Sequence, residues 1–184
     1  MSNGTPALVH LVRAKIPHQV HQYEAPATDG SAQARGERIA YGAAAAEALG
    51  VPAAQLFKSL VVALEHASGA PGVLGASDVR QEKYGIALVS VDREASLKRV
   101  ARAFGARRAE LLDPAEVTKV TGYVIGGVSP FGTKRPLHVV IDDAALALPH
   151  VYLSAGQRGL AIEISSADLI RGLNAIVAPI AGAE

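Results

Sequence analysis

Short apolar runs recur along the chain and predict buried β-strands. They are rich in valine, isoleucine and leucine and lie between glycine-rich, proline-rich or charged segments, a pattern that is typical of strands. A looser alternation from Ile16 through Val20 to Tyr23 predicts one further strand. The predicted strands are residues 16–23, 56–65, 84–92, 137–142, 151–156, 160–165 and 175–177.

Helices are predicted where apolar residues return every three or four positions behind a capping residue. Thr5 before Pro6, and Asp113 before Pro114, combine an N-cap side chain with a proline in the first turn. Gly50 ends an alanine-rich helix, because glycine readily takes the left-handed conformation that ends helices. The predicted helices are residues 5–16, 41–50, 93–104, 113–122 and 166–171.

The order of these elements predicts an α+β fold. Strands outnumber helices and no regular strand-helix alternation runs through the chain, which favours a mixed sheet with helices packed around it. A length of 184 residues suits one domain, residues 1–184, with flexible ends at about 1–4 and 179–184. The segments 25–40 and 66–83 lack periodicity and are predicted loops.

Composition narrows the class of protein. Apolar residues make up 49% of the chain and charged residues 19%, which indicates a globular rather than a disordered protein. The absence of cysteine excludes disulfides and thiolate metal sites. No apolar run approaches the ~20 residues of a membrane span, and the first residues lack the features of a signal peptide. We therefore expect a cytoplasmic protein that does not contact a membrane.

Positive charge is concentrated between Arg93 and Arg108. This window holds six basic residues and one acid, Glu94, a net charge of +5. The predicted helix in this window would direct Lys98, Arg99 and Arg102 away from its apolar stripe. The window is either a solvated helix face or a surface that contacts nucleic-acid phosphates.

The segment "TGYVIGGVSPFGTK", residues 121–134, is the least generic part of the chain. It does not form a serine-nucleophile elbow, because Pro130 follows Ser129 and has no backbone N–H for an oxyanion hole. The spacing of its glycines and lysine also does not fit a Walker phosphate loop. Two interpretations remain: a tight connection between strands, or a backbone surface that a ligand approaches closely at Gly126 and Gly127, which lack Cβ atoms.

Few side chains stand out for acid-base or metal chemistry. Only His18 and His21 lie close together, and a spacing of three places them on opposite faces of a strand, so we expect no metal site. Asp142, at the end of a predicted strand, is typical of a turn. Lys58 opens a buried strand, where it either reaches out to solvent or contacts a phosphate. A second glycine loop, "SAGQRG", carries Arg158.

Three segments, "FKSLVV", "TGYVIGGVSPFGTK" and "YLSAGQRGLAIEIS", occur in an order and spacing that resemble the YbaK family. This family comprises free-standing relatives of the editing domain inserted in bacterial prolyl-tRNA synthetase. The resemblance extends from about Pro6 to Val177. It implies a mixed, partly barrel-like β-sheet surrounded by helices, with a pocket for the 3′ end of a mischarged tRNA.

The resemblance also implies roles for individual residues. The lysine that holds a phosphate or the terminal adenosine of the tRNA corresponds to Lys58, and backbone groups of Gly126 and Gly127 are expected to position the aminoacyl carbonyl. These three form the expected catalytic set. The expected substrate-binding residues are Tyr23, Ser59, Ser129, Pro130, Asp142 and Arg158.

The implied activity is hydrolysis of the ester of mischarged tRNA(Pro), first of all Cys-tRNA(Pro), without a cofactor or metal. Relatives that clear Ala-tRNA(Pro) or Ser- and Thr-bearing tRNAs share the lysine and the glycine loop, so these substrates stay open. A non-catalytic module that binds tRNA or a nucleotide is a further alternative. The implied partners are the aminoacyl end of tRNA and prolyl-tRNA synthetase.

Overall fold

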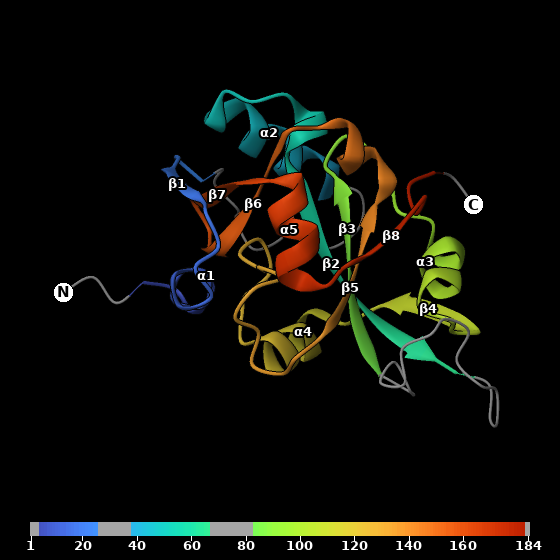
Figure 1. Cartoon of the computed structure of the whole chain (residues 1–184). Coiled ribbons are helices and arrows are strands. Elements are labelled where there is room, and N and C mark those ends of the chain that lie inside the picture. Colours follow the sequence, from blue (N-terminus) through green and yellow to red (C-terminus); the bar gives the residue numbers. More distant parts are fainter. Residues whose placement is uncertain (1–3, 26–37, 67–82, 183–184) are drawn as a thin grey trace.

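The fold is built on a mixed five-stranded sheet and a smaller antiparallel sheet (Figure 1). A computed structural model describes residues 4–25, 38–66 and 83–182. The larger sheet has the order β4-β2-β3-β5-β8, in which β2 is antiparallel to β3 and β4, and β3, β5 and β8 are parallel. Its strands are β2 (Phe57–Glu65), β3 (Tyr84–Ser90), β4 (Arg108–Leu111), β5 (His138–Asp142) and β8 (Ile176–Ala178).

The smaller sheet contains three antiparallel strands in the order β1-β7-β6. They are β1 (Gln19–Gln22), β6 (His150–Gln157) and β7 (Leu160–Ser165). A single parallel bridge between Leu56 and Tyr152 links the two sheets just before β2 begins. The α+β class with a mixed sheet is therefore confirmed, but the described strands form two sheets, neither of which closes into a barrel.

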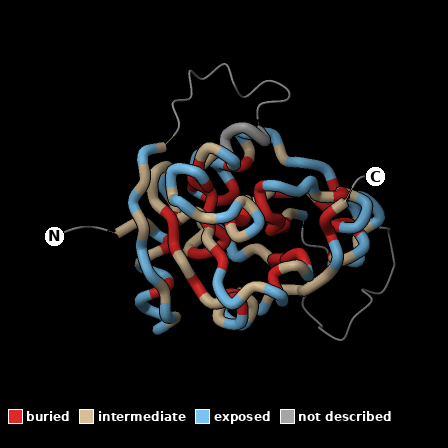
Figure 2. Tube along the Cα trace, turned by 90° about the horizontal axis from the view of Figure 1, so that it is seen from above, coloured by how far each residue is buried: buried red, intermediate tan, exposed pale blue. Residues whose placement is uncertain are grey.

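Five helices lie around the sheets in the described part of the chain. Figure 1 shows α2 and α4 at opposite ends of the molecule, α3 beside β4, and α5 packed across the strands. Buried residues gather inside this shell and exposed ones cover it (Figure 2). The helices are α1 (Pro6–Arg13), α2 (Arg38–Leu49), α3 (Leu97–Ala103), α4 (Pro114–Thr121) and α5 (Ser166–Leu173), with short 3₁₀ helices η1 (Ala53–Gln55) and η2 (Asp143–Ala147).

Local capping signals in the sequence hold in the structure. The Thr5 side chain accepts the N–H of Leu8 at 3.3 Å, and the Asp113 side chain accepts the N–H of Ala115 at 2.9 Å. Gly50 has a φ of 68°, in the left-handed region, directly after α2. Each signal depends on residues adjacent in sequence, so the helix ends they mark were predictable.

Some features differ from the sequence predictions. Helix α3 begins at Leu97 rather than 93, because Ser96 is its N-cap and donates its backbone N–H to Ile180. Strand β4 was not predicted, since only Ala109 is buried in it and it lacks an apolar run. The end predicted to be flexible, residues 179–184, includes Ile180, which is fully buried.

Most of the two predicted loops, 25–40 and 66–83, lies outside the described residues. Within the described residues, no helix is both long and apolar enough to cross a membrane.

Candidate functional site

A cavity of about 260 Å³ lies against the first half of β2. Strand β2 pairs with β3 along its length but with β4 only over its last four residues, Val62–Glu65. Strand β4 ends at Leu111, and the next residue, Leu112, donates its N–H to the Val61 carbonyl at 2.9 Å. The cavity occupies the space beside residues 57–61, where no neighbouring β4 residue covers β2.

The cavity wall is mostly apolar, with a few polar side chains. Apolar walls come from β2, the segment between β4 and α4, and the segment 125–128. An apolar concavity with a few convergent polar groups is typical of a small-molecule or cofactor site. The polar side chains on the wall are those of Tyr23, Lys58, Ser59, Ser154 and Arg158. Four of these, all but Ser154, were predicted from the sequence.

Lys58 supplies a cation at this wall. Burial lowers the pKa of its ammonium, and the carboxylates of Glu94 and Asp92 raise it in part. Among the residues that the structure describes, none hydrogen-bonds or ion-pairs with the Lys58 Nζ. A half-buried ammonium without a hydrogen-bond partner is available to an anionic ligand, because a phosphate would replace the water that burial has removed.

Ser59 supplies a second unengaged group. Its Oγ is buried and has no hydrogen-bond partner in the described structure. Successive strand residues point to opposite faces, so Ser59 lies on the face of β2 that carries Phe57 and Val61, and Lys58 on the face that carries Leu60 and Val62. Buried hydroxyls are almost always paired in folded proteins, which makes a group on a bound ligand the natural partner of Ser59.

Substitution of Ser59 by alanine tests this unpaired hydroxyl. We expect Ser59→Ala to leave the free energy of unfolding unchanged or to raise it by up to about 1 kcal/mol, because the change removes a buried, unsatisfied group. Ser129→Ala is the matched control. The buried Ser129 Oγ accepts the N–H of Phe131 at 3.3 Å, so its loss is expected to cost about 1–2 kcal/mol. Urea unfolding measures both; a loss of 1 kcal/mol or more for Ser59→Ala would show that its hydroxyl is satisfied within the protein.

The glycine segment joins α4 to β5, rather than joining two strands. Gly126 lines the cavity and has a φ of 85°, which favours glycine. Gly127 does not line the cavity. Its N–H donates to the Val124 carbonyl at 3.0 Å, and a Cβ added to it would lie 3.2 Å from the backbone nitrogen of Arg158. The two glycines therefore differ, with Gly126 at the cavity and Gly127 packed against the turn between β6 and β7.

The rest of this segment lies behind the cavity wall. Ser129 and Pro130 are buried and are not among the lining residues. Arg158 holds the segment from the other side, because its Nε donates to the Ile125 carbonyl at 2.9 Å. Tyr23 reaches the cavity from the end of β1, where its backbone N–H donates to the Gly159 carbonyl at 3.0 Å.

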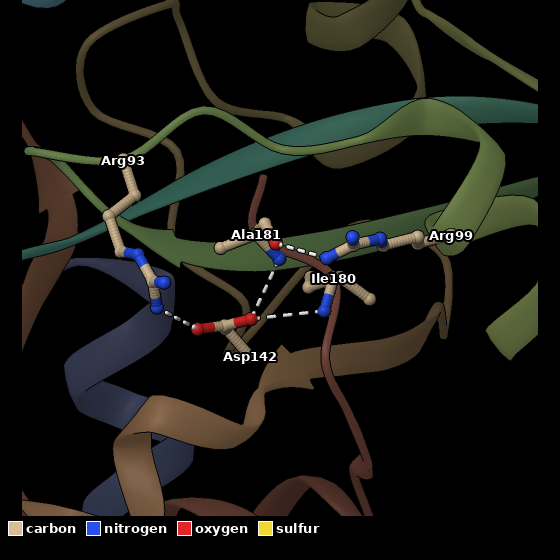
Figure 3. Close-up of polar contacts among 5 residues, drawn as sticks. All are labelled: Arg93, Arg99, Asp142, Ile180 and Ala181. Atoms are coloured by element: carbon tan, nitrogen blue, oxygen red, sulfur yellow. Dashed lines mark hydrogen bonds and ion pairs between the residues drawn. The ribbon is translucent and has the colours of Figure 1, made fainter. Parts of the chain in front are cut away.

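Asp142, expected among the substrate-binding residues, is not one of the residues that line the cavity. Figure 3 shows its polar contacts instead. Its Oδ1 accepts the N–H groups of Ile180 at 3.0 Å and Ala181 at 2.8 Å, and its Oδ2 accepts from Arg93 Nη1 at 3.2 Å. The carboxylate is 1% exposed and is satisfied by these donors. The sequence could not show this, because the C-terminal residues that engage Asp142 are nearly forty positions away.

A family model described as an aminoacyl-tRNA editing domain matches residues 37–171. The chain belongs to the aminoacyl-tRNA editing domain family. The matched range contains β2 with Lys58, the glycine segment and the turn at Arg158, and so most of the cavity wall. The family predicted from the sequence is confirmed.

This editing domain has low sequence identity to individual relatives. It is 29% identical over 120 residues to a protein of Enterococcus faecalis (strain V583) named as a candidate Cys-tRNA(Pro)/Cys-tRNA(Cys) deacylase, EbsC, covering 65% of this chain and 64% of that protein. It is 31% identical over 87 residues to the multifunctional Ser/Thr-tRNA deacylase ProXp-y of Escherichia coli K12, covering 47% and 52%. The chain thus matches between half and two thirds of the length of these curated relatives.

A solved structure shows the same fold over nearly the whole chain. A crystal structure described as a candidate trans-editing enzyme for prolyl-tRNA synthetase superposes with a TM-score of 0.73. The match covers 97% of this editing domain and 96% of that chain, at 23% sequence identity.

The basic window of this editing domain is partly neutralised. Arg93 pairs with Asp142, Arg107 with Glu65 at 3.6 Å, and Arg108 with Glu110 at 2.6 Å. The Nη1 of Arg99 donates to a carbonyl oxygen, which leaves its charge uncompensated. Lys98 and Arg102 are exposed on α3 and have no ion-pair partner among the described residues. Of the six basic residues in this window, three on α3 therefore have no acidic partner among the residues that the structure describes.

The two acids that raise the pKa of Lys58 were not identified from the sequence. Asp92 and Glu94 follow β3, which is antiparallel to β2 and places Val89 opposite Lys58. The signal was present as "VDRE" directly after an apolar strand, but its relation to Lys58 depends on the strand register. Within the described ranges no group of three or more His, Asp or Glu side chains could hold a metal ion.

Proposed function

We propose that this protein is a trans-editing aminoacyl-tRNA deacylase that hydrolyses the ester of mischarged tRNA(Pro), with Cys-tRNA(Pro) as its first substrate. One observation carries the proposal: in a chain of the editing family, the Lys58 ammonium, which no described residue hydrogen-bonds or pairs with, belongs to a residue on the wall of an apolar cavity that Gly126 also lines. The wall thus combines a cation for the tRNA backbone with main-chain groups for the aminoacyl carbonyl.

The proposed chemistry needs little from side chains. In ester hydrolysis, water adds to the carbonyl carbon, the bond to the ribose oxygen breaks, and the amino acid and free tRNA are released. Because an aminoacyl ester is already activated, placing its carbonyl and the attacking group can supply most of the acceleration. Lys58 would hold a phosphate or the terminal adenosine, and main-chain groups at Gly126 would orient the carbonyl.

The other predicted residues fall into two groups in this proposal. Tyr23, Ser59 and Arg158 line the cavity, so they are proposed to contact the substrate directly. Gly127, Ser129 and Pro130 support the segment from behind, because they pack or hydrogen-bond within the protein.

The size and lining of the cavity favour a small amino acid. A synthetase discriminates one methylene by only about 1–3 kcal/mol, so amino acids smaller than or similar to its own substrate require a second site for removal. The Ser59 hydroxyl, which has no partner among the described residues, could hydrogen-bond a thiol or hydroxyl, as cysteine and serine carry. The relatives EbsC and ProXp-y are named for Cys-tRNA and for Ser- and Thr-tRNA, respectively. Cysteine is therefore our first candidate, and alanine, serine and threonine are the alternatives.

A deacylation panel tests the proposal. Cys-tRNA(Pro), Ala-tRNA(Pro), Ser-tRNA and Pro-tRNA(Pro) are charged in vitro and incubated with the protein. We expect rapid loss of Cys-tRNA(Pro) and no effect on Pro-tRNA(Pro). Loss of only the alanyl or seryl ester would keep the activity and change the substrate. Stable esters throughout, together with binding of uncharged tRNA, would favour a non-catalytic binding module.

The pH dependence of deacylation is expected to follow Lys58. Burial lowers the pKa of the Lys58 ammonium, so Lys58 loses its proton at a pH below 10.5, the pKa of a solvated lysine. We expect kcat/KM, corrected for spontaneous hydrolysis, to fall as the pH rises through the lowered pKa. The free energy of unfolding should rise with pH over the same range. The unfolded chain keeps this proton up to a pH of about 10.5, so it binds more protons than the folded protein between the two pKa values, and the folded state gains stability there as the pH rises.

Lys58→Arg is the control for this pH profile. Arginine keeps its charge throughout the range, so the activity that remains should lack the decline. A decline of the same shape in wild type and Lys58→Arg would assign the titration to another group.

We also propose that the protein acts in the cytoplasm together with prolyl-tRNA synthetase. The support is the structural likeness to a candidate trans-editing enzyme for that synthetase. Co-purification of the synthetase with the tagged protein in the presence of tRNA tests the association, and its absence would indicate that the two act independently.

A further inference from the structure

A buried carboxylate outside the cavity holds the C-terminal strap, defined as residues 179–182, in place (Figure 3). Asp142, the last residue of β5, accepts two backbone N–H groups of the strap, from Ile180 and Ala181. Its second oxygen pairs with Arg93, whose side chain is half exposed. One buried acid therefore joins β5, the strap and the segment after β3.

The strap lies along residues 94–96 as a short antiparallel pair. Ser96 donates its N–H to the Ile180 carbonyl at 2.9 Å, and Gly182 donates to the Glu94 carbonyl at 2.9 Å. The segment 94–96 is thus fixed by main-chain hydrogen bonds to residues that Asp142 holds in turn.

Helix α3 contacts the strap from its other side. Arg99 Nη1 donates to the Ala181 carbonyl at 2.7 Å (Figure 3). Asp142 and Arg99 therefore engage the N–H and the C=O of Ala181, on the edge of the strap that points away from residues 94–96.

The segment 92–96, held by the strap at 94–96 and by Asp142 at Arg93, carries the two acids that act on Lys58. Asp92 and Glu94 are the two charged groups that act on the Lys58 ammonium in the described structure, and they oppose the effect of burial. Arg93, which lies between them, is anchored by its pair with Asp142 and by its N–H, which donates to the Ser90 carbonyl at 3.1 Å. The distance between Lys58 and its two acids thus depends on contacts made outside the cavity.

We propose that Asp142 is a positioning residue for Lys58: by holding Arg93 and the C-terminal strap, it fixes the segment 92–96 and thereby the carboxylates of Asp92 and Glu94, which directly follow the strand that pairs with the strand of Lys58. Asp142 does not touch the cavity, so this role differs from a substrate contact. The effect on activity rests on the proposed deacylase function, whereas the effect on Lys58 does not.

Asp142→Asn is the test variant. An asparagine can still accept from the strap, but it loses the charge that pairs with Arg93 and directs an NH₂ group at one of the three donors. We expect the segment 92–96 to loosen, so that Asp92 and Glu94 raise the pKa of Lys58 less. In wild type and variant, ¹³C-dimethylated lysines are titrated by NMR, with Lys58→Arg identifying the Lys58 signal. The Lys58 titration is expected to shift to lower pH in the variant.

A double-mutant cycle separates positioning from general destabilisation. In the Asp92→Asn/Glu94→Gln background the carboxylates are gone, so adding Asp142→Asn should leave the Lys58 titration unchanged. Arg102→Gln, on the exposed face of α3 and without a strap contact, should also leave it unchanged. A Lys58 titration that is unaffected by Asp142→Asn in the folded wild-type background, or that still shifts in the charge-removed background, would overturn the proposal.

If Asp142→Asn does not fold, Arg93→Gln and Arg99→Gln still test the proposal. Arg93→Gln removes the ion pair with Asp142, and Arg99→Gln removes the donor to the Ala181 carbonyl of the strap. Both are expected to shift the Lys58 titration in the same direction as Asp142→Asn. Deacylation is the second readout. We expect kcat/KM to fall about tenfold in Asp142→Asn, with its high-pH decline displaced to lower pH. A shifted titration without any deacylation in wild type would sustain the positioning role and reject the deacylase function.

Discussion

Lys58→Ala is expected to lower kcat/KM for deacylation by about 100-fold or more and to leave the fold intact. The side chain ends in a half-buried ammonium that makes no hydrogen bond or ion pair with the described residues, so its removal breaks no such bond with them. It does remove a charge that would hold the tRNA end in a poorly hydrated site, where such contacts contribute most. Steady-state deacylation and thermal unfolding measure the two effects separately.

Lys98→Ala provides the control for this prediction. Lys98 is an exposed lysine on α3 without an ion-pair partner in the described ranges, and it does not line the cavity. Its removal should change deacylation several-fold at most. An unchanged rate in Lys58→Ala, or equal losses in the two variants, would refute the assigned role of Lys58.

Gly126→Ala is expected to lower kcat/KM by about 100-fold. Gly126 has a φ of 85°, where an L-residue costs roughly 1 kcal/mol, and it lines the cavity. The added Cβ would shift the main chain that faces the proposed position of the ester, and small displacements of reacting groups have large effects on rate.

Gly122→Ala separates strain from site geometry. Gly122 has a nearly equal φ of 80° at the end of α4, and a Cβ there would meet only the Lys134 Cβ at 3.6 Å. The two variants should lose similar stability in urea unfolding, while only Gly126→Ala loses activity. Equal losses of activity would mean that Gly126 acts through the folding of its segment rather than at the cavity.

Much of the secondary structure was predictable because its causes are local. Thr5 and Asp113 cap helices through hydrogen bonds that span two or three residues, and the apolar run of β2 reflects burial of both faces of a central strand. The strand that carries Lys58 and Ser59 was therefore identified together with the local position of both residues. Four of the five polar side chains on the cavity wall were found in the sequence in this way or by resemblance.

The remaining features depend on contacts between distant residues. Strand β4 has no apolar run of its own and exists because it pairs with the second half of β2. Asp142 ends a strand as predicted, but its partners are Arg93 and the C-terminal strap, which no local pattern relates to it. The separation into two sheets likewise depends on pairing and register that composition does not encode.

The gap beside β2 shows how the non-local part of the fold creates the site. The cavity exists because β4 covers only the second half of β2, and Gly126 reaches it because the segment after α4 returns beside that gap. Sequence patterns identified the residues on both sides, but only the topology brings Lys58 and Gly126 to one cavity.

Single-turnover hydrolysis of Cys-tRNA(Pro) by excess protein, with wild type and Lys58→Ala compared side by side, tests the central claim most directly. We predict that wild type releases cysteine at least about 100-fold faster than spontaneous hydrolysis, and that Lys58→Ala approaches the spontaneous rate. If the Cys-, Ala- and Ser-tRNA esters are all hydrolysed only at the spontaneous rate in the presence of folded wild-type protein, the deacylase function is contradicted.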